Sequence, residues 1–252
     1  MAGLPAAAFW ATVAVTLFSG FVKGTVGFAM PLIMISVFSA YLPPEIALSG
    51  LIVPTVVTNI SQSFRQGVGP VLDAVRKYWR LILATMVFIV ISAQFVRIIP
   101  QDLFLMLLGV PVSLYALLQL SGRKLVVPLR NRRTAEWGFG IVSGLYGGVA
   151  GVWGPPVLIY LLSTGTEKAE TVRISGVIFL IGAVVLFTAH LQTGVMNAQT
   201  VPFSAFLVLP AMAGLLLGYR VQDRLDQARF RWWTQLLLLL TGLNLMRRAL
   251  GL

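Results

Sequence analysis

Six apolar runs take up much of the sequence and limit what the chain can fold into. A helix needs about 20 apolar residues to cross the roughly 30 Å hydrocarbon core of a bilayer. Charged residues make up only 11% of the chain, whereas a soluble domain carries about 25%, so this sequence cannot cover a water-facing surface. We therefore predict an all-α polytopic membrane protein with one integral membrane domain. The runs span residues 46–64, 81–96, 103–120, 174–189, 201–219 and 232–246.

The chain carries a formal net charge of +11 at pH 7, which in a soluble protein would suggest nucleic-acid binding. Its Lys and Arg residues crowd into short segments between the apolar runs, and such segments orient a membrane protein by staying in the cytoplasm. The pattern therefore predicts a lipid bilayer, and no nucleic acid, as a partner. The chain has no cysteine, so it offers no disulfide and no thiolate metal site, and we expect no cofactor.

Two copies of one glycine-rich segment divide the chain into similar halves. Residues 19–31 (SGFVKGTVGFAMP) align with residues 143–155 (SGLYGGVAGVWGP), so that a Ser, three Gly and a Pro coincide at a constant offset of 124 residues. Three plain apolar runs follow each copy. An internal duplication of this kind predicts two homologous halves, residues 1–122 and 136–252, joined by a basic linker over residues 123–135.

Each half is expected to contain one broken element followed by three helices. The broken element of the second half would be about 45 Å long as one helix, at 1.5 Å per residue. That length is too great for a single upright crossing and too small for two. In the first half the broken element spans residues 4–43 and the helices span 46–64, 78–97 and 102–121; in the second half the corresponding ranges are 137–166 and 173–191, 201–219 and 231–250.

The distribution of charge favours re-entrant hairpins over simple crossings for the two glycine-rich elements. If every element crossed the bilayer, Lys and Arg would divide only weakly between the two sides. If each glycine-rich element returns to the side it entered from, only Arg97, Arg247 and Arg248 lie opposite the other basic residues outside the membrane, as the positive-inside rule requires. Three crossings per half make the halves inverted repeats. We therefore predict a multi-pass inner-membrane protein with a cytoplasmic linker and both termini outside the cytoplasm.

Both glycine-rich elements contain a break, over residues 24–30 and 147–154, and each break leads into proline, Pro31 or Pro155. Within a bilayer, irregular backbone is tolerated only where it is buried in protein or lines a cavity. Proline favours the first position of a helix, so a half-helix with unpaired N–H groups and a positive dipole end should begin at each break. Such helix ends bind anions, and paired broken helices recur in transporters.

The same glycines fit a second interpretation, in which they only let helices approach closely. Gly20 and Gly24 match the small-residue spacing of packed membrane helices, as do Gly214 and Gly218. For Gly214 and Gly218 we favour this packing role. At the two breaks, where glycine density, proline and duplication coincide, we favour a role in binding.

Lys23 lies in the middle of the first broken element, too far from either end to reach water easily. A charge within the membrane costs at least about 2.5 kcal/mol on insertion scales and is a candidate functional residue. Beside the start of a half-helix it would add a full positive charge for an anionic substrate. The alternative is a lysine that extends along a tilted helix to the interface. Its repeat partner is Gly147, so the symmetry of any site is imperfect.

Further polar and aromatic residues complete the predicted substrate site. Asn59 and Trp153 lie within apolar segments, where interhelical contacts would also account for them. Arg173 opens the helix after the second break and either lines the cytoplasmic entrance or simply adds to the positive-inside charge. The predicted substrate-binding residues are Lys23, Gly24, Thr25, Gly27, Pro31, Asn59, Gly148, Gly151, Trp153, Gly154, Pro155 and Arg173.

No carboxylate lies deep within an apolar run, which argues against a carboxylate proton relay and a dedicated cation site. Protons remain a candidate coupling ion through lysine, histidine or the substrate itself. His190, the only histidine, is expected at the outer end of its span, as an interfacial side chain or a proton-coupling group. A membrane protease would have to use Ser143 or Ser175 with His190, and the chain offers no metal cluster or phosphate loop, so we predict no enzyme.

Two segments resemble the signature segments of the TauE/SafE family of membrane proteins: residues 22–28 (VKGTVGF) and residues 147–162 (GGVAGVWGPPVLIYLL). The resemblance extends over the whole chain in its length, duplication and spacing of spans. It implies transport of sulfite, of organosulfonates such as sulfoacetate, or of related small anions, outward from a bacterial cytoplasm. The sequence departs from the family at Ala29, Met30 and Trp153, where glycine is common.

These observations predict a secondary transporter that exports small sulfur-containing anions by alternating access around the two half-helix ends. An anion channel, or an exporter of another small organic anion, would use the same site, and the sequence does not separate these alternatives. It also leaves the oligomeric state open.

Overall fold

The computed structural model describes residues 5–64, 67–122, 127–166, 168–221 and 226–252, and all regular structure among them is helical. The all-α fold class predicted from the sequence is therefore confirmed. The helices are α1 (Ala6–Val26), α2 (Met30–Phe38), α3 (Pro44–Ser63), α4 (Gly69–Lys77), α5 (Trp79–Ala93), α6 (Gln101–Leu120), α7 (Arg132–Ala150), α8 (Gly154–Ser163), α9 (Lys168–Gln192), α10 (Thr200–Val221) and α11 (Gln227–Ala249).

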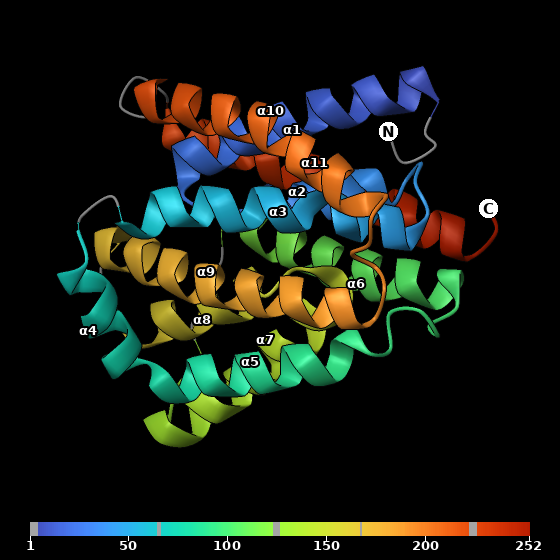
Figure 1. Ribbon diagram of the computed structural model, residues 1–252. Coiled ribbons are helices and arrows are strands. Elements are labelled where there is room, and N and C mark those ends of the chain that lie inside the picture. Colours follow the sequence, from blue (N-terminus) through green and yellow to red (C-terminus); the bar gives the residue numbers. More distant parts are fainter. Residues whose placement is uncertain (1–4, 65–66, 123–126, 167, 222–225) are drawn as a thin grey trace.

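The long helices run roughly lengthwise through the molecule, and the two chain termini lie at the same end (Figure 1). α1 packs along α10 on one side of the molecule, α5 packs along α7 on the other, and α3 and α9 lie between these pairs. When the halves are aligned by their repeat, α1 corresponds to α7 and α10 corresponds to α5. The contact of α1 in the first half with α10 in the second therefore has its counterpart in the contact of α7 in the second half with α5 in the first.

Both broken elements fold back on themselves. The Thr12 hydroxyl, near the start of α1, lies 3.3 Å from the Tyr41 hydroxyl just beyond α2. In the second half, the Tyr160 hydroxyl near the end of α8 donates to the carboxylate of Glu136 in the first turns of α7, at 3.0 Å. Each short helix thus returns toward the end of the molecule at which its long partner began.

Ionic contacts mark the two ends of the molecule. At the terminus end, Arg97 donates to Glu45 at the start of α3 (3.2 Å), and Arg248 donates to the Ser39 carbonyl (2.7 Å). At the opposite, linker end, Arg80 and Arg132 each lie 3.4 Å from the buried carboxylate of Glu136.

A further ion pair at the linker end joins Lys77 of α4 to Glu170 of α9, at 2.9 Å. The hydrogen bond from Lys77 holds the pKa of the Glu170 carboxyl below its ordinary value, and burial opposes this only in part. The pair therefore ties the end of α4 to the start of α9.

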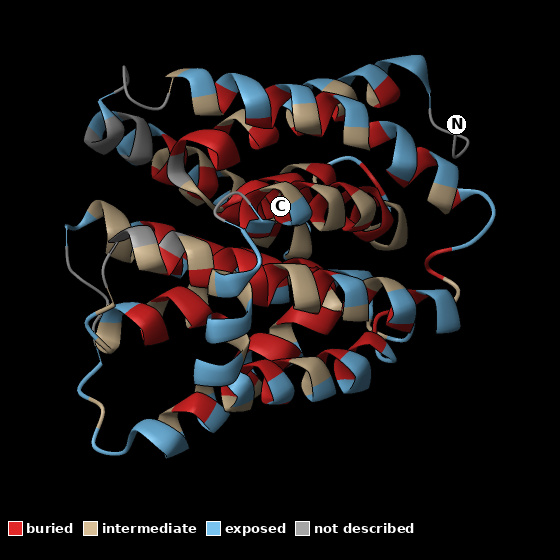
Figure 2. Ribbon diagram, turned by 60° about the vertical axis from the view of Figure 1, so that its left-hand side comes forward, coloured by how far each residue is buried: buried red, intermediate tan, exposed pale blue. Residues whose placement is uncertain are grey.

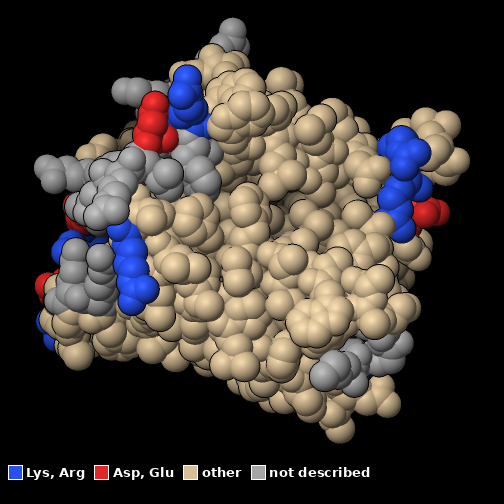
Figure 3. All heavy atoms as spheres, turned by 90° about the horizontal axis from the view of Figure 1, so that it is seen from above, with Lys and Arg blue, Asp and Glu red and all other residues tan. Residues whose placement is uncertain are grey.

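The surface between the two ends is apolar. Figure 3 shows Lys and Arg gathered at opposite edges of the molecule with uncharged residues across the band between them. Leu209, Leu240 and Leu114 are among the large hydrophobic side chains that face outward, while each helix turns its buried residues inward (Figure 2). Such a band is what a bilayer requires of the surface it touches. The chain is therefore a multi-pass membrane protein.

Five helices among the described residues are long and apolar enough to cross a bilayer: Ala6–Thr25, Pro44–Ser63, Gln101–Leu120, Arg173–Gln192 and Thr200–Val221. α5 and α8 are apolar but shorter. The expected helix over 78–97 is regular only to Ala93, and the short helix α4, which the apolar runs do not predict, precedes it. Part of the predicted linker, residues 123–126, lies outside the described residues.

Glycines set the close contacts between the long helices. A Cβ atom on Gly24 would collide with the Leu215 carbonyl of α10 and would lie 2.8 Å from Gly218 Cα. At the equivalent place in the second half, a Cβ on Gly148 would meet the Ile89 carbonyl of α5. Both glycines were predicted to bind substrate, and the structure places them where two helix backbones touch.

Candidate functional site

The first break separates α1 from α2. α1 ends with Gly27 in the left-handed conformation (φ 86°), and the Gly27 N–H donates to the Lys23 carbonyl at 2.8 Å. Ala29 also has a positive φ, 79°. Among the described residues, every other residue with a positive φ is a glycine. The left-handed region costs an alanine roughly 1–2 kcal/mol, so the surrounding packing holds this break in a strained shape. α2 then starts at Met30 with Pro31 in its first turn.

The second break repeats this design between α7 and α8. Gly151 ends α7 in the left-handed conformation (φ 69°), and its N–H donates to the Gly147 carbonyl at 2.8 Å. α8 begins at Gly154, followed by Pro155 and Pro156. Trp153, which occupies the position equivalent to Ala29, packs its indole over Gly147.

Both breaks line one small cavity inside the molecule. Its volume is about 30 Å³, which holds one or two water molecules and is too small for an organosulfonate. Three further helices complete the wall, with Thr55 from α3, Tyr115 from α6 and Phe179 from α9. The lining residues are Phe28, Ala29, Pro31, Leu32, Thr55, Tyr115, Gly151, Val152, Trp153, Gly154, Pro155 and Phe179.

The start of each half-helix faces this cavity. The backbone ladder of α2 begins with Ile33 N–H donating to the Ala29 carbonyl (2.9 Å), and that of α8 begins with Val157 N–H donating to the Trp153 carbonyl (3.5 Å). In the first turn of α8 two successive prolines carry no N–H, so Gly154 is the donor that remains there. α2 has only one proline in its first turn, and its start is therefore richer in donors.

Thr55 gives the cavity wall a buried hydroxyl that has no hydrogen-bond partner among the described residues. The residue is 1% exposed. Sequence analysis missed it, although it lies one helical turn before Asn59, which was predicted. Tyr115 and Phe179 were also missed, because nothing in the apolar runs shows which aromatic side chains face inward.

Lys23 is buried beside the cavity wall rather than in it. The residue is 1% exposed, and its ammonium donates to the Thr58 hydroxyl (3.0 Å) and to the Asn59 side-chain oxygen. Both partners are neutral. The side chain therefore does not extend to the membrane surface, as the alternative interpretation of the sequence required.

The other predicted residues fall into two groups. Pro31, Gly151, Trp153, Gly154 and Pro155 lie together in the cavity wall.

Thr25, Gly27 and Arg173 lie outside that wall. Thr25 donates to the Val22 carbonyl within its own helix, and the Gly27 carbonyl accepts from the Gln62 amide at 2.9 Å. Arg173, half-buried near the start of α9, has an Nε without a hydrogen-bond partner among the described residues.

His190 is buried between helices near the end of α9. Its Nε2 lies 3.0 Å from the Gly148 carbonyl and its Nδ1 lies 3.1 Å from the Thr193 hydroxyl. These contacts tie the end of α9 to α7 and leave neither Ser143 nor Ser175 bonded to the imidazole. Within the described residues there is also no group of His, Asp and Glu side chains able to hold a metal ion.

Comparison with known proteins gives one finding. The family model described as "Sulfite exporter TauE/SafE" matches residues 12–245, nearly the whole chain. No curated protein and no solved structure matches the chain.

Proposed function

Because the chain belongs to the TauE/SafE family of membrane transporters, we propose that it exports small sulfur-containing anions such as sulfite, sulfoacetate or a similar organosulfonate. The family consists of transporters and not enzymes. The substrate class, the direction of transport and the site described below are parts of the proposal.

One observation carries the proposal: the starts of two half-helices line the same cavity inside a membrane protein. Each start contributes the positive end of a helix dipole and unpaired N–H groups. Because both point into one low-dielectric space, that space favours an anion over a neutral solute or a cation. The present volume fits a closed, substrate-free state that must widen to accept its substrate.

Lys23 supplies the second attraction for an anion. Its ammonium is buried, and the oxygens that accept from it, on Thr58 and Asn59, carry no charge. A positive charge at this depth without a carboxylate is costly. An anionic substrate that approaches the cavity would offset that cost.

The two halves provide a basis for alternating access. We take residues 1–122 and 136–252 as inverted repeats, each with one re-entrant hairpin and three crossings. Equivalent contacts support this assignment, since α1 packs on α10 as α7 packs on α5. Transport would follow when the pairs rock against each other and open the cavity to one side at a time. The small size of the cavity favours such a carrier over an open channel.

Orientation and energetics agree with export through an inner membrane. Most basic residues of the sequence belong to the linker end, which we assign to the cytoplasm by the positive-inside rule; both termini then lie outside. An inside-negative potential helps to expel an anion by about 2.3 kcal/mol per charge per 100 mV. Export therefore needs no obligatory coupling ion, although protons remain a candidate.

Binding to the purified protein tests the proposal. Thermal unfolding is followed with sulfite, sulfoacetate, sulfate, lactate and chloride in turn. A ligand at about 100 times its Kd stabilises the native state by about 2.7 kcal/mol, so sulfite or sulfoacetate should raise Tm by several degrees at millimolar concentration. Since the chain has no cysteine, sulfite cannot act on a disulfide. Equal shifts with all five anions, or a shift with lactate alone, would overturn the assignment of sulfur-containing anions.

A further inference from the structure

The buried face of α3 changes from mainly apolar to polar at the point where the helix passes the cavity. Between the terminus end and the cavity this face is mainly apolar, with Leu48, Leu51 and Ile52 fully buried, and the one buried hydroxyl there, that of Ser49, donates to the Ile46 carbonyl of its own helix. From Thr55 toward the linker end, it is polar. The buried polar residues of this part are Thr55, Thr58, Asn59, Gln62 and Ser63. Since residues three and four apart lie on one helix face, they form a polar track that rises about 5.4 Å per turn.

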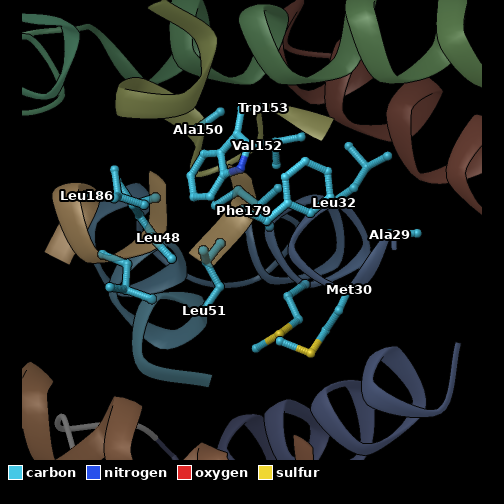
Figure 4. Close-up of a cluster of buried hydrophobic side chains, with 14 of the residues drawn as sticks. Ala29, Met30, Leu32, Leu48, Leu51, Ala150, Val152, Trp153, Phe179 and Leu186 are labelled. Carbon is cyan, nitrogen blue, oxygen red and sulfur yellow. The ribbon is translucent and has the colours of Figure 1, made fainter. Parts of the chain in front are cut away.

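The apolar part of α3 packs against the second break. A Cβ on Gly151 would lie 2.8 Å from a methyl carbon of Leu51 and 3.0 Å from one of Leu48. Figure 4 shows these leucines and Leu186 gathered close to Trp153 and Phe179. The second break thus meets close-packed hydrocarbon on the part of α3 nearer the terminus end.

The polar track is rich in donors that lack acceptors. The Thr55 hydroxyl and the Asn59 amide nitrogen are buried without a hydrogen-bond partner among the described residues. Lys23 adds a charged donor that, within the described part of the chain, bonds only to the neutral oxygens of Thr58 and Asn59. A buried unsatisfied polar group is costly, and an oxyanion carries several acceptor oxygens. The chemistry of the track therefore matches a sulfonate or sulfite group.

We infer that Thr55 is a substrate-binding and specificity-determining residue, and that the polar face of α3 is the route by which the oxyanion group passes between the cavity and the linker end. In the cavity the Thr55 hydroxyl donates to a sulfonate oxygen that the half-helix starts also face. One turn further, Asn59 and Lys23 receive the same group. This inference rests on the proposed function, because it assigns the ligand of the same cavity.

Thr55→Val tests the role of the hydroxyl, and Thr85→Val and Thr55→Ser are its controls. Because the hydroxyl has no partner in the described part of the chain, its replacement by a methyl group of similar size should leave Tm unchanged or higher. Thr85 is equally buried but donates within α5 and does not line the cavity. Dissociation constants are measured by titration calorimetry with whichever sulfur-containing anion stabilises the unchanged protein.

We expect the Kd of Thr55→Val to be ten- to hundredfold higher than that of the unchanged protein, because the variant loses one hydrogen bond to a charged group. Thr55→Ser should stay within about threefold of the unchanged protein, and Thr85→Val should match it. An unchanged Kd for Thr55→Val, or an equal loss for Thr85→Val, would overturn the inference. If the unchanged protein bound none of the sulfur-containing anions, the proposed function itself would fail, which is a different outcome.

The route is tested by labelling single cysteines, since the chain has none of its own. Ser63→Cys lies at the linker end of the polar track, and Leu48→Cys lies in the apolar part of α3. A water-soluble thiol reagent added on the linker side should label position 63 and be blocked by bound substrate. Labelling at position 48 but not at 63 would place the route on the other side of the cavity.

Discussion

The ammonium of Lys23 is buried in the last turn of α1, beside the first break, and bonds to two neutral side chains. Sequence analysis identified this residue because a charge inside a long apolar element is rare and costly. Its position beside Asn59 could not be predicted, because that contact joins α1 to α3. That the two bind substrate stays a prediction.

Lys23→Met tests whether this charge holds the anion. Methionine has a similar length and no charge, so the fold should persist with equal or higher Tm, because a buried unpaired charge is removed. Anion affinity should fall at least tenfold, as expected for a lost charge-assisted contact. Calorimetry measures the Kd, and Lys77→Met, which removes an exposed lysine of α4, is the control. Unchanged affinity in a folded Lys23→Met protein would refute the role of Lys23.

Thr55 shows what sequence reasoning could not supply at the residue scale. A threonine in an apolar helix commonly donates to a carbonyl of its own helix, as Thr12 and Thr16 do here. Nothing in the sequence distinguishes Thr55 from these. Its missing partner becomes evident only when α3 is packed against both breaks.

At the scale of elements, the two breaks were predictable because local rules determine them. Glycine in the left-handed conformation ends α1 and α7, and proline opens α2 and α8. The start of α7 was placed too late in the sequence analysis, at residue 137. The Asn131 side chain accepts from the backbone N–H groups of Arg133 and Thr134, and this cap lets the helix begin at Arg132 within the basic segment.

Gly151→Ala should disturb the second break in two ways. The φ of 69° disfavours any side chain, and the new methyl would press on Leu51 and Leu48. Gly165→Ala is a matched control, because its φ is 70° and nothing lies within 4 Å of the added Cβ. We expect Gly151→Ala to be less stable than the control by about 1–3 kcal/mol and to lose anion binding, as measured by thermal unfolding and calorimetry. Equal behaviour of the two variants would show that contact with the leucines is unimportant.

Gly24→Ala should act through helix packing. The added methyl would force α1 away from α10, and overpacking typically costs about 1–3 kcal/mol. Gly138→Ala in α7 meets no atom within 4 Å and should unfold at a temperature close to that of the unchanged protein. A Gly24→Ala variant with full stability but impaired anion affinity would instead favour the binding role first predicted for Gly24.

At the scale of the whole molecule, the bilayer makes much of the fold predictable. Apolar runs of span length and the position of basic residues give the fold class and a proposed topology. The pairing of α1 with α10 and of α5 with α7 was not predicted. Helices in a membrane pack closely where small residues of both helices lie at the same depth in the bilayer. The sequence shows where the small residues are, but it does not show which helix each of them contacts.

The proposed topology predicts opposite exposure of two surface positions. Val127, in the linker, and Gln199, in the turn before α10, are both exposed. Single cysteines introduced there should react with a membrane-impermeant reagent from opposite sides of the membrane, Val127→Cys from the cytoplasm. Labelling of both from one side would contradict the inverted arrangement of the halves.

Charge movement across liposomes that contain the purified protein tests the central claim most directly. Sulfite, sulfoacetate, sulfate, lactate and chloride are added in turn, and current is recorded against liposomes with Lys23→Met. We predict a saturable current with sulfite or sulfoacetate that is largely lost in the variant, because an anion crosses without full charge compensation. Saturable current with chloride or lactate, and none with sulfite or sulfoacetate, would contradict the account of a sulfur-anion exporter.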